Sequence, residues 1–138
     1  MTERKYLPGL ADLIDRMFIV QLKEIFIPEH RDEYRAERAP IEHDIGLILK
    51  NLAPLSPKEI HAIGVIMLAN RFIWENESRA RAGGSEQDKL LKATHSINGV
   101  RNRAKNVLAA FEEGRHDYKL DCLAAELDDQ FGNWNIFT

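Results

Sequence analysis

The chain has 138 residues, of which 44% are hydrophobic and 30% charged, with 19 Lys and Arg against 22 Asp and Glu. These values favour one globular domain spanning 1–138 and exclude a disordered chain or a second core. The longest apolar run, residues 62–69, falls far short of the roughly 20 residues that cross a bilayer. No apolar signal core follows the first residues, and Cys122 is the lone cysteine. We therefore expect a cytoplasmic protein with no membrane partner.

Apolar residues recur at three- and four-residue steps along most of the chain, which predicts an all-α fold. The first stripe runs from Leu10 to Ile25 and ends before Pro28. The second continues towards Asn51 and contains Pro40, which predicts a kink or two abutting helices at that point. No run of alternating β-branched residues is long enough to suggest a strand.

A long antiparallel helical hairpin is predicted over about 57–82 and 86–113. Ser56, Pro57 and Glu59 form a helix start signal, and Gly83-Gly84 forms a stop signal. Because few residues separate the two helices, they should pack side by side, with Asn70 level with Asn98. With the two N-terminal helices and a short C-terminal helix over about 120–131, the hairpin predicts a helical bundle. We expect the aromatic tail after it to dock on its own core, with a neighbouring subunit or a partner protein as the alternative.

Polar residues form a stripe along this hairpin and are the candidate site. Asparagine disfavours helices by roughly 0.5 kcal/mol against alanine, so several asparagines within two helices indicate a specific role. Carboxamides, an indole and cations together suit a small planar or anionic ligand. Residues 71–105 carry eight basic and four acidic side chains, which supports an anion site. The predicted ligand-binding residues are Asn70, Trp74, Glu77, Arg81, Asn98, Arg101, Asn102 and Lys105.

Two other interpretations of this polar stripe stay open. Polar residues at interior positions also fix helix register and oligomeric state, so the stripe can be a seam between subunits. Alternatively, the stripe is an ordinary solvent-exposed face, in which Glu77 and Arg81 form an i,i+4 ion pair.

The same residues resemble those of a known family. Asn70, Trp74, Glu77 and the Ala80-Arg81 pair, followed by Ile97-Asn98 and Arg101-Asn102, are similar to a pattern in small helical proteins of unknown function from bacteria and phages. The opening Leu13-Ile14-Asp15-Arg16 is similar to that of phage-encoded members. The resemblance covers about half of the chain. Because the family has no assigned activity, it implies only that the stripe forms one unit.

Catalytic and metal-binding patterns are absent from the sequence at the required spacing. Glu113 and His116 form the single Glu-x-x-His element, but Gly114 lies between them and a di-iron site needs two such elements. The acidic pairs that hold magnesium in helical pyrophosphohydrolases do not occur in the right order, and Cys122 has no histidine nearby in sequence. We predict no catalytic residue, no metal and no cofactor, and an enzyme is the less favoured class.

The sequence thus predicts a non-enzymatic helical protein that forms homo-oligomers and binds a small anionic or nucleotide-like ligand. The phage resemblance adds the hypothesis that it sequesters a signalling nucleotide. Two alternatives are a structural or adaptor oligomer whose polar stripe is a subunit interface, and a metal-dependent nucleotide phosphohydrolase. Nucleic-acid binding is not expected, because the basic residues are interleaved with glutamates.

Overall fold

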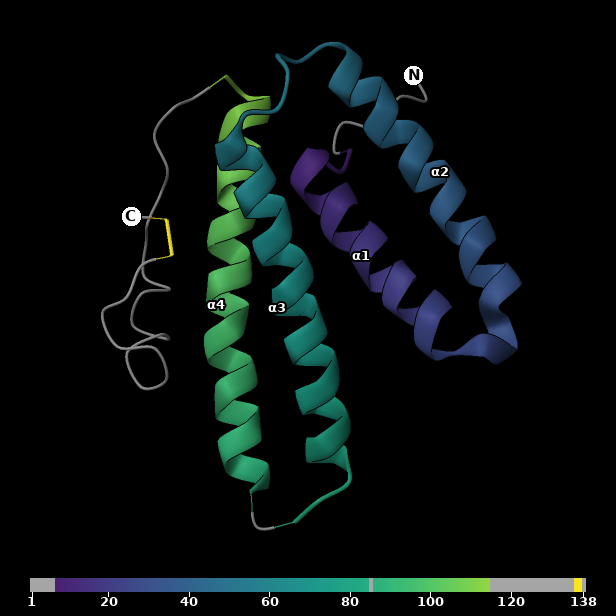
Figure 1. Ribbon diagram of the computed structural model, residues 1–138, viewed down its shortest axis with the longest axis vertical. Coiled ribbons are helices and arrows are strands. Elements are labelled where there is room, and N and C mark those ends of the chain that lie inside the picture. Colours follow the sequence, from purple (N-terminus) through teal and green to yellow (C-terminus); the bar gives the residue numbers. More distant parts are fainter. Residues whose placement is uncertain (1–6, 85, 115–135, 138) are drawn as a thin grey trace.

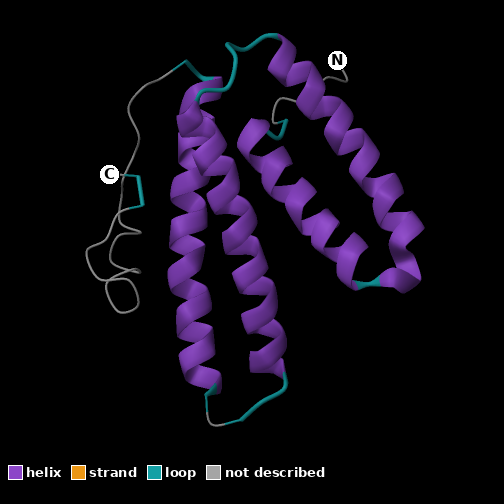
Figure 2. Cartoon of the chain, viewed as in Figure 1, coloured by secondary structure: helices purple, strands orange, loops and turns teal. Residues whose placement is uncertain are grey.

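The computed structural model describes residues 7–84, 86–114, 136 and 137. Within these residues the chain forms four α-helices and no strand, which confirms the predicted all-α class (Figures 1 and 2). Two antiparallel helical hairpins lie side by side and together form the bundle. The helices are α1 (Leu10–Phe26), α2 (Arg31–Lys50), α3 (Pro57–Arg81) and α4 (Gln87–Glu112), with a 3-10 turn, η1 (Pro28–His30), between the first two.

The α3–α4 hairpin has bounds within one residue of those predicted. At its start, the Glu59 carboxylate accepts hydrogen bonds from the backbone N–H of Ser56 at 2.9 Å and from its hydroxyl at 2.6 Å. At its tip, Gly83 and Gly84 have φ values of 81° and 115°, a conformation that side chains other than glycine disfavour. The predicted start and stop signals of α3 are therefore confirmed.

The core of the hairpin is built from small and β-branched side chains. Ile66 and Leu108 are fully buried, and Val65, Val100 and Val107 surround them. Small buried side chains let two helices approach closely along their length. On α3 and α4 the small buried residues are Ala62, Ala69, Ala80, Ala93, Ser96, Gly99, Ala104 and Ala110.

The N-terminus of α1 is held by the far end of α4. The backbone N–H of Leu10 donates a hydrogen bond to Glu112 Oε1 at 2.8 Å, which gives one of the unpaired N–H groups of the first turn an acceptor. A Cβ atom on Gly9 would lie 2.7 Å from the same oxygen, so a residue with a side chain would push Glu112 away. Leu10 and Ile14 then pack into the core of the α3–α4 hairpin.

The second helix, α2, runs unbroken through Pro40, so the alternative of two abutting helices is wrong. Pro40 and Ala36, whose carbonyl would otherwise bond to residue 40, are both exposed, so water can bond to the freed carbonyl. Ile41 is the buried residue of α2 and packs with Leu13 and Val20 of α1. In the described ranges, the backbone of α2 lies next to α1 and η1 only, while its side chains Ile45, Ile48 and Leu49 reach the apolar core that α1, α3 and α4 form.

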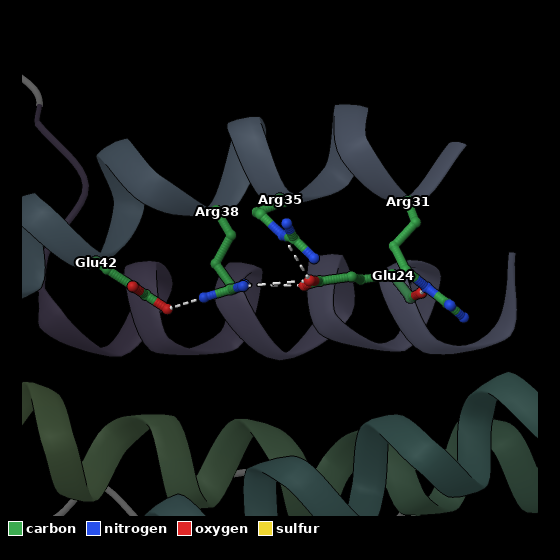
Figure 3. A network of polar contacts seen from close by, with 5 residues as sticks. All are labelled: Glu24, Arg31, Arg35, Arg38 and Glu42. Atoms are coloured by element: carbon green, nitrogen blue, oxygen red, sulfur yellow. Dashed lines mark hydrogen bonds and ion pairs between the residues drawn. The ribbon is translucent and has the colours of Figure 1, made fainter. Parts of the chain in front are cut away.

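A network of charges fastens α2 to the end of α1 (Figure 3). The guanidinium of Arg38 donates to both oxygens of Glu24, at 2.9 and 3.2 Å, and also binds Glu42. Arg35 lies 3.8 Å from Glu24, while Arg31 donates to the backbone carbonyl of Glu24 at 2.8 Å. The hydrogen bond from Arg38 is the main cause that lowers the pKa of Glu24. The network thus joins Glu24 of α1 to three arginines of α2, two through its carboxylate and one through its backbone carbonyl.

The described residues near the C-terminus contact the hairpin. Ile136 and Phe137 pack against the core, and the Phe137 ring lies edge-on to His61 at 5.5 Å between centroids. The docking of the tail on its own core is therefore observed for these two residues. Trp134 and the helix predicted over about 120–131 lie outside the described residues.

Replacing Ile66 with Ala is expected to lower the free energy of unfolding by about 3 kcal/mol, because the fully buried side chain would leave a cavity. The neighbouring Met67 is 49% exposed, and Met67→Ala should change stability by no more than about 0.5 kcal/mol. Urea unfolding followed by circular dichroism measures both variants. Equal losses would contradict the assigned core.

Replacing Glu24 with Gln is expected to make the melting temperature depend less on pH in the acidic range. The folded-state pKa of Glu24 lies below its unfolded value of about 4.3, so its contribution is complete above that value and is lost as pH falls through the folded pKa. Melting temperatures from about pH 6 to about pH 3 should fall less for Glu24→Gln than for the parent protein. Glu37→Gln, an exposed acid of α2, is the control and should follow the parent.

Candidate functional site

Helix α1 lies across the polar stripe and supplies a carboxylate to it. Asp15 is buried on the side of α1 that faces the hairpin, and its Oδ1 accepts a hydrogen bond from the Asn70 amide at 2.7 Å. The Asn70 carbonyl oxygen in turn accepts a hydrogen bond from Arg101 Nη1 at 2.8 Å. These three residues, here called the Asp15 relay, join α1, α3 and α4 through one chain of hydrogen bonds.

Ionic contacts reinforce the Asp15 relay. Arg101 Nε lies 4.0 Å from Asp15 Oδ1, and Lys105 Nζ lies 3.6 Å from Asp15 Oδ2. Lys105 also pairs with the exposed Asp12 at 2.9 Å. Side-chain exposures of 11% for Asp15, 21% for Arg101 and 24% for Lys105 place these charges away from most of the solvent. A carboxylate in this position is stabilised only if cations and donors surround it.

The contact between Asn70 and Arg101 follows from the predicted register. The sequence places Asn70 level with Asn98, one helical turn before Arg101. Side chains on a helix lean towards its N-terminus, which in α4 is the end at the hairpin tip. The long Arg101 side chain therefore reaches back to the level of Asn70, and the amide finds a guanidinium instead of a second amide.

A groove of about 500 Å³ lies between α1 and α3, and we call it the α1–α3 groove. Ile19, Leu22 and Lys23 line it from α1, and Ile73 and Ser78 line it from α3. Five of the eight residues predicted to bind a ligand also line it. These five are Asn70, Trp74, Glu77, Arg81 and Arg101.

Aromatic residues lie at the end of α1 beside this groove. The rings of Phe26 and Trp74 are tilted by 31° and lie 6.2 Å apart between centroids. The Arg71 guanidinium lies over the Phe26 ring at 4.4 Å, a cation–π distance. Trp74 is therefore fixed from one side by Phe26 while it also lines the groove.

The other three predicted residues lie outside the α1–α3 groove. Lys105 lines a second depression of about 450 Å³ with Asp12, Asp15 and Arg16, at the start of α1. Asn98 and Asn102 are half-buried on α4 and line neither of these two depressions. The structure thus divides the predicted set between a groove, a neighbouring depression and the flank of α4.

Sequence reasoning missed the part of the site that α1 supplies. Asp15 and Lys23 were not among the predicted site residues, because the hairpin alone does not show which helix packs over it. A signal was present, since Asp15 directly follows Leu13 and Ile14 in an otherwise apolar stripe. A charged residue next to buried positions of an amphipathic helix indicates a partner on the opposite side.

Comparisons with protein-family models, curated proteins and solved structures found no match to this chain. The resemblance to small helical proteins of bacteria and phages therefore stays a prediction. Across the described residues, no three His, Cys, Asp or Glu side chains are grouped so that they could hold a metal ion. In the same residues, no helix is both long enough and apolar enough to cross a membrane.

Replacing Asp15 with Asn is expected to lower the free energy of unfolding by about 3 kcal/mol, because two largely buried cations would lose their carboxylate. Asp12→Asn is the matched control on the same helix. Asp12 has 57% side-chain exposure, so its ion pair should contribute at most about 1 kcal/mol. Urea unfolding of both variants makes the comparison, and similar losses would contradict the structural role of the Asp15 relay.

Proposed function

We propose that this chain is a binding protein and not an enzyme, and that it takes a small anionic molecule into the α1–α3 groove. The observation that carries the proposal is the convergence on one groove of five polar and aromatic residues predicted from the hairpin alone. A volume of about 500 Å³ suits a small organic molecule. Nucleotide-like ligands belong to the class to be tested.

The groove combines the two kinds of contact that such a ligand needs. Ile19, Leu22 and Ile73 provide apolar contact, and the Trp74 indole provides a flat surface for a planar group. The cations Lys23, Arg81 and Arg101 line the same groove and attract an anion. Asn70 is already bonded to Asp15 and Arg101, so its role is to orient Arg101 and not to contact the ligand.

A structural or adaptor oligomer is the second candidate function. It is favoured by Ile60, Met67 and Leu68, large apolar residues that α3 leaves exposed. Several exposed apolar side chains on one helix are typical of a protein-contact surface. In the described structure, Asn70, Trp74 and Arg101 of the polar stripe contact side chains of α1, so a subunit interface would use the outer face of α3 instead.

The sequestering of a signalling nucleotide rests on the family resemblance and stays a prediction. A cytoplasmic location rests on the lone Cys122 and is part of the same proposal.

Replacing Ser78 with Trp is expected to abolish ligand binding by filling the mouth of the α1–α3 groove, which Ser78 lines. The parent protein should show a rise in melting temperature with at least one member of a panel of nucleotides, cyclic nucleotides and organic acids. At a concentration of 100 times the dissociation constant, a ligand stabilises the folded state by about 2.7 kcal/mol. The Ser78→Trp variant should show no shift with the same compound.

Leu68→Trp is the matched control for this experiment. It adds the same indole to the exposed face of α3, away from the groove, without changing charge. This variant should bind as the parent does. A flat panel with the parent protein, combined with elution as an oligomer in size-exclusion chromatography, would reject the groove and favour the second candidate function.

A further inference from the structure

The charges that line the α1–α3 groove restrict the chemical class of the ligand more narrowly than the shape of the groove does. Three cations line it, and two of them already have carboxylate partners. Arg81 lies 3.4 Å from Glu77, and Arg101 lies 4.0 Å from Asp15, to which it is also linked through Asn70. These two pairs are close to neutral as they stand.

Lys23 is the third cation, and no carboxylate among the described residues balances its charge. Its ammonium lies 5.9 Å from the centre of the Tyr34 ring, and in the described part of the chain it forms no ion pair with a carboxylate. The groove and the partners of its cations therefore carry one uncompensated positive charge, at Lys23 on α1. One negative charge on a ligand would balance it.

Arg101 also lines the groove, but its guanidinium is directed towards Asn70 and Asp15 of the Asp15 relay. Its Nε is buried and has no hydrogen-bond partner, although the side chain lines the groove. A buried donor without an acceptor is unfavourable by an amount comparable to a lost hydrogen bond. The Asp15 carboxylate, 4.0 Å away, offsets part of that penalty, and the buried Nε is not accessible to a ligand in the groove.

Besides the three cations and the polar residues Asn70, Glu77 and Ser78, the lining is apolar. Ile19, Leu22 and Ile27 form one wall, and Ile73 with the Trp74 indole forms the other. Such walls bind hydrocarbon or aromatic surface and provide few donors for a sugar or for several phosphates. A second negative charge on the ligand would find no second unbalanced cation in the groove, because Arg81 and Arg101 are already paired with Glu77 and Asp15.

We infer that the ligand of the α1–α3 groove is an amphipathic monoanion, a single carboxylate on an aromatic or branched apolar body, held by Lys23 at its charged end. This inference rests on the proposed function and narrows its ligand class. It places polyphosphate nucleotides outside the preferred class.

The test compares matched ligands by isothermal titration calorimetry with the full chain. Indole-3-propionate is the acid probe, indole-3-propionamide is its neutral counterpart of the same shape, and AMP and ATP are the nucleotide probes. The acid should bind with one site per chain and about tenfold more tightly than the amide, since one charge-assisted contact is lost. ATP should bind more weakly than the acid.

Lys23→Gln and Lys89→Gln form the matched pair of variants. Both remove one positive charge, but Lys89 is exposed on α4 and does not line the groove. Lys23→Gln should weaken binding of the acid about fivefold and leave binding of the amide unchanged. Lys89→Gln should change neither. Melting curves in the absence of ligand show that both variants are folded.

Three results would overturn the inference. Equal affinity for the acid and the amide would show that the charge at Lys23 is not used. Tighter binding of AMP or ATP than of the acid, abolished by Ser78→Trp, would leave the proposed function in place and reject the monoanion. No binding of any compound in this set or in the wider panel would reject the monoanion and the proposed function together.

Discussion

The buried Asp15 carboxylate is the constraint on which the arrangement of this protein depends. A carboxylate between packed helices is strongly unfavourable unless donors and cations surround it, and here Asn70, Arg101 and Lys105 do so from two other helices. Apolar contacts between α1 and the hairpin favour burial, but they would also form if α1 were shifted along the hairpin. The polar contacts of Asp15 with Asn70, Arg101 and Lys105 form in one register only. The position of α1 follows from it, and so does the groove that opens beside the Asp15 relay.

Because Arg101 takes part in the Asp15 relay and also lines the α1–α3 groove, the packing of the helices and the proposed ligand site share a side chain. Such sharing has a benefit for binding. Asn70 holds the guanidinium in place before any ligand arrives, so little side-chain entropy remains to be lost on association. It also explains why polar residues recur along the interior of the hairpin. Asn70, Arg101 and Lys105 among them hold the three helices together beside the groove.

The fold was predictable from the sequence because its signals are local. Ser56 with Glu59, the Gly83-Gly84 pair and the apolar periodicity define α3 and α4 to within one residue. About half of the candidate site was predictable, because the residue spacing along the α3–α4 hairpin places Asn70, Trp74 and Arg101 on the same side of it. The half supplied by α1 depends on the packing of non-adjacent segments, which periodicity does not encode. Pro40 shows the converse. Of the kink and the two abutting helices expected there, the second is wrong, since solvent on the exposed face can bond to the freed carbonyl and α2 continues through Pro40.

Helix α2 lies at the edge of the bundle, and this position affects the order in which the helices unfold. Within the described residues, α2 has backbone neighbours in α1 but not in the hairpin, and it is held by the cluster around Ile41, by the Glu24 network and by partly buried side chains at its C-terminal end that reach the main core. Local unfolding follows the weakest boundary between cooperative units. Release of α2 leaves α1, α3 and α4 in contact, so backbone amides of α2 should exchange with solvent at a lower free energy than those around Ile66. The arrangement of the helices thus predicts that α1, α3 and α4 form one cooperative unit and that α2 opens first.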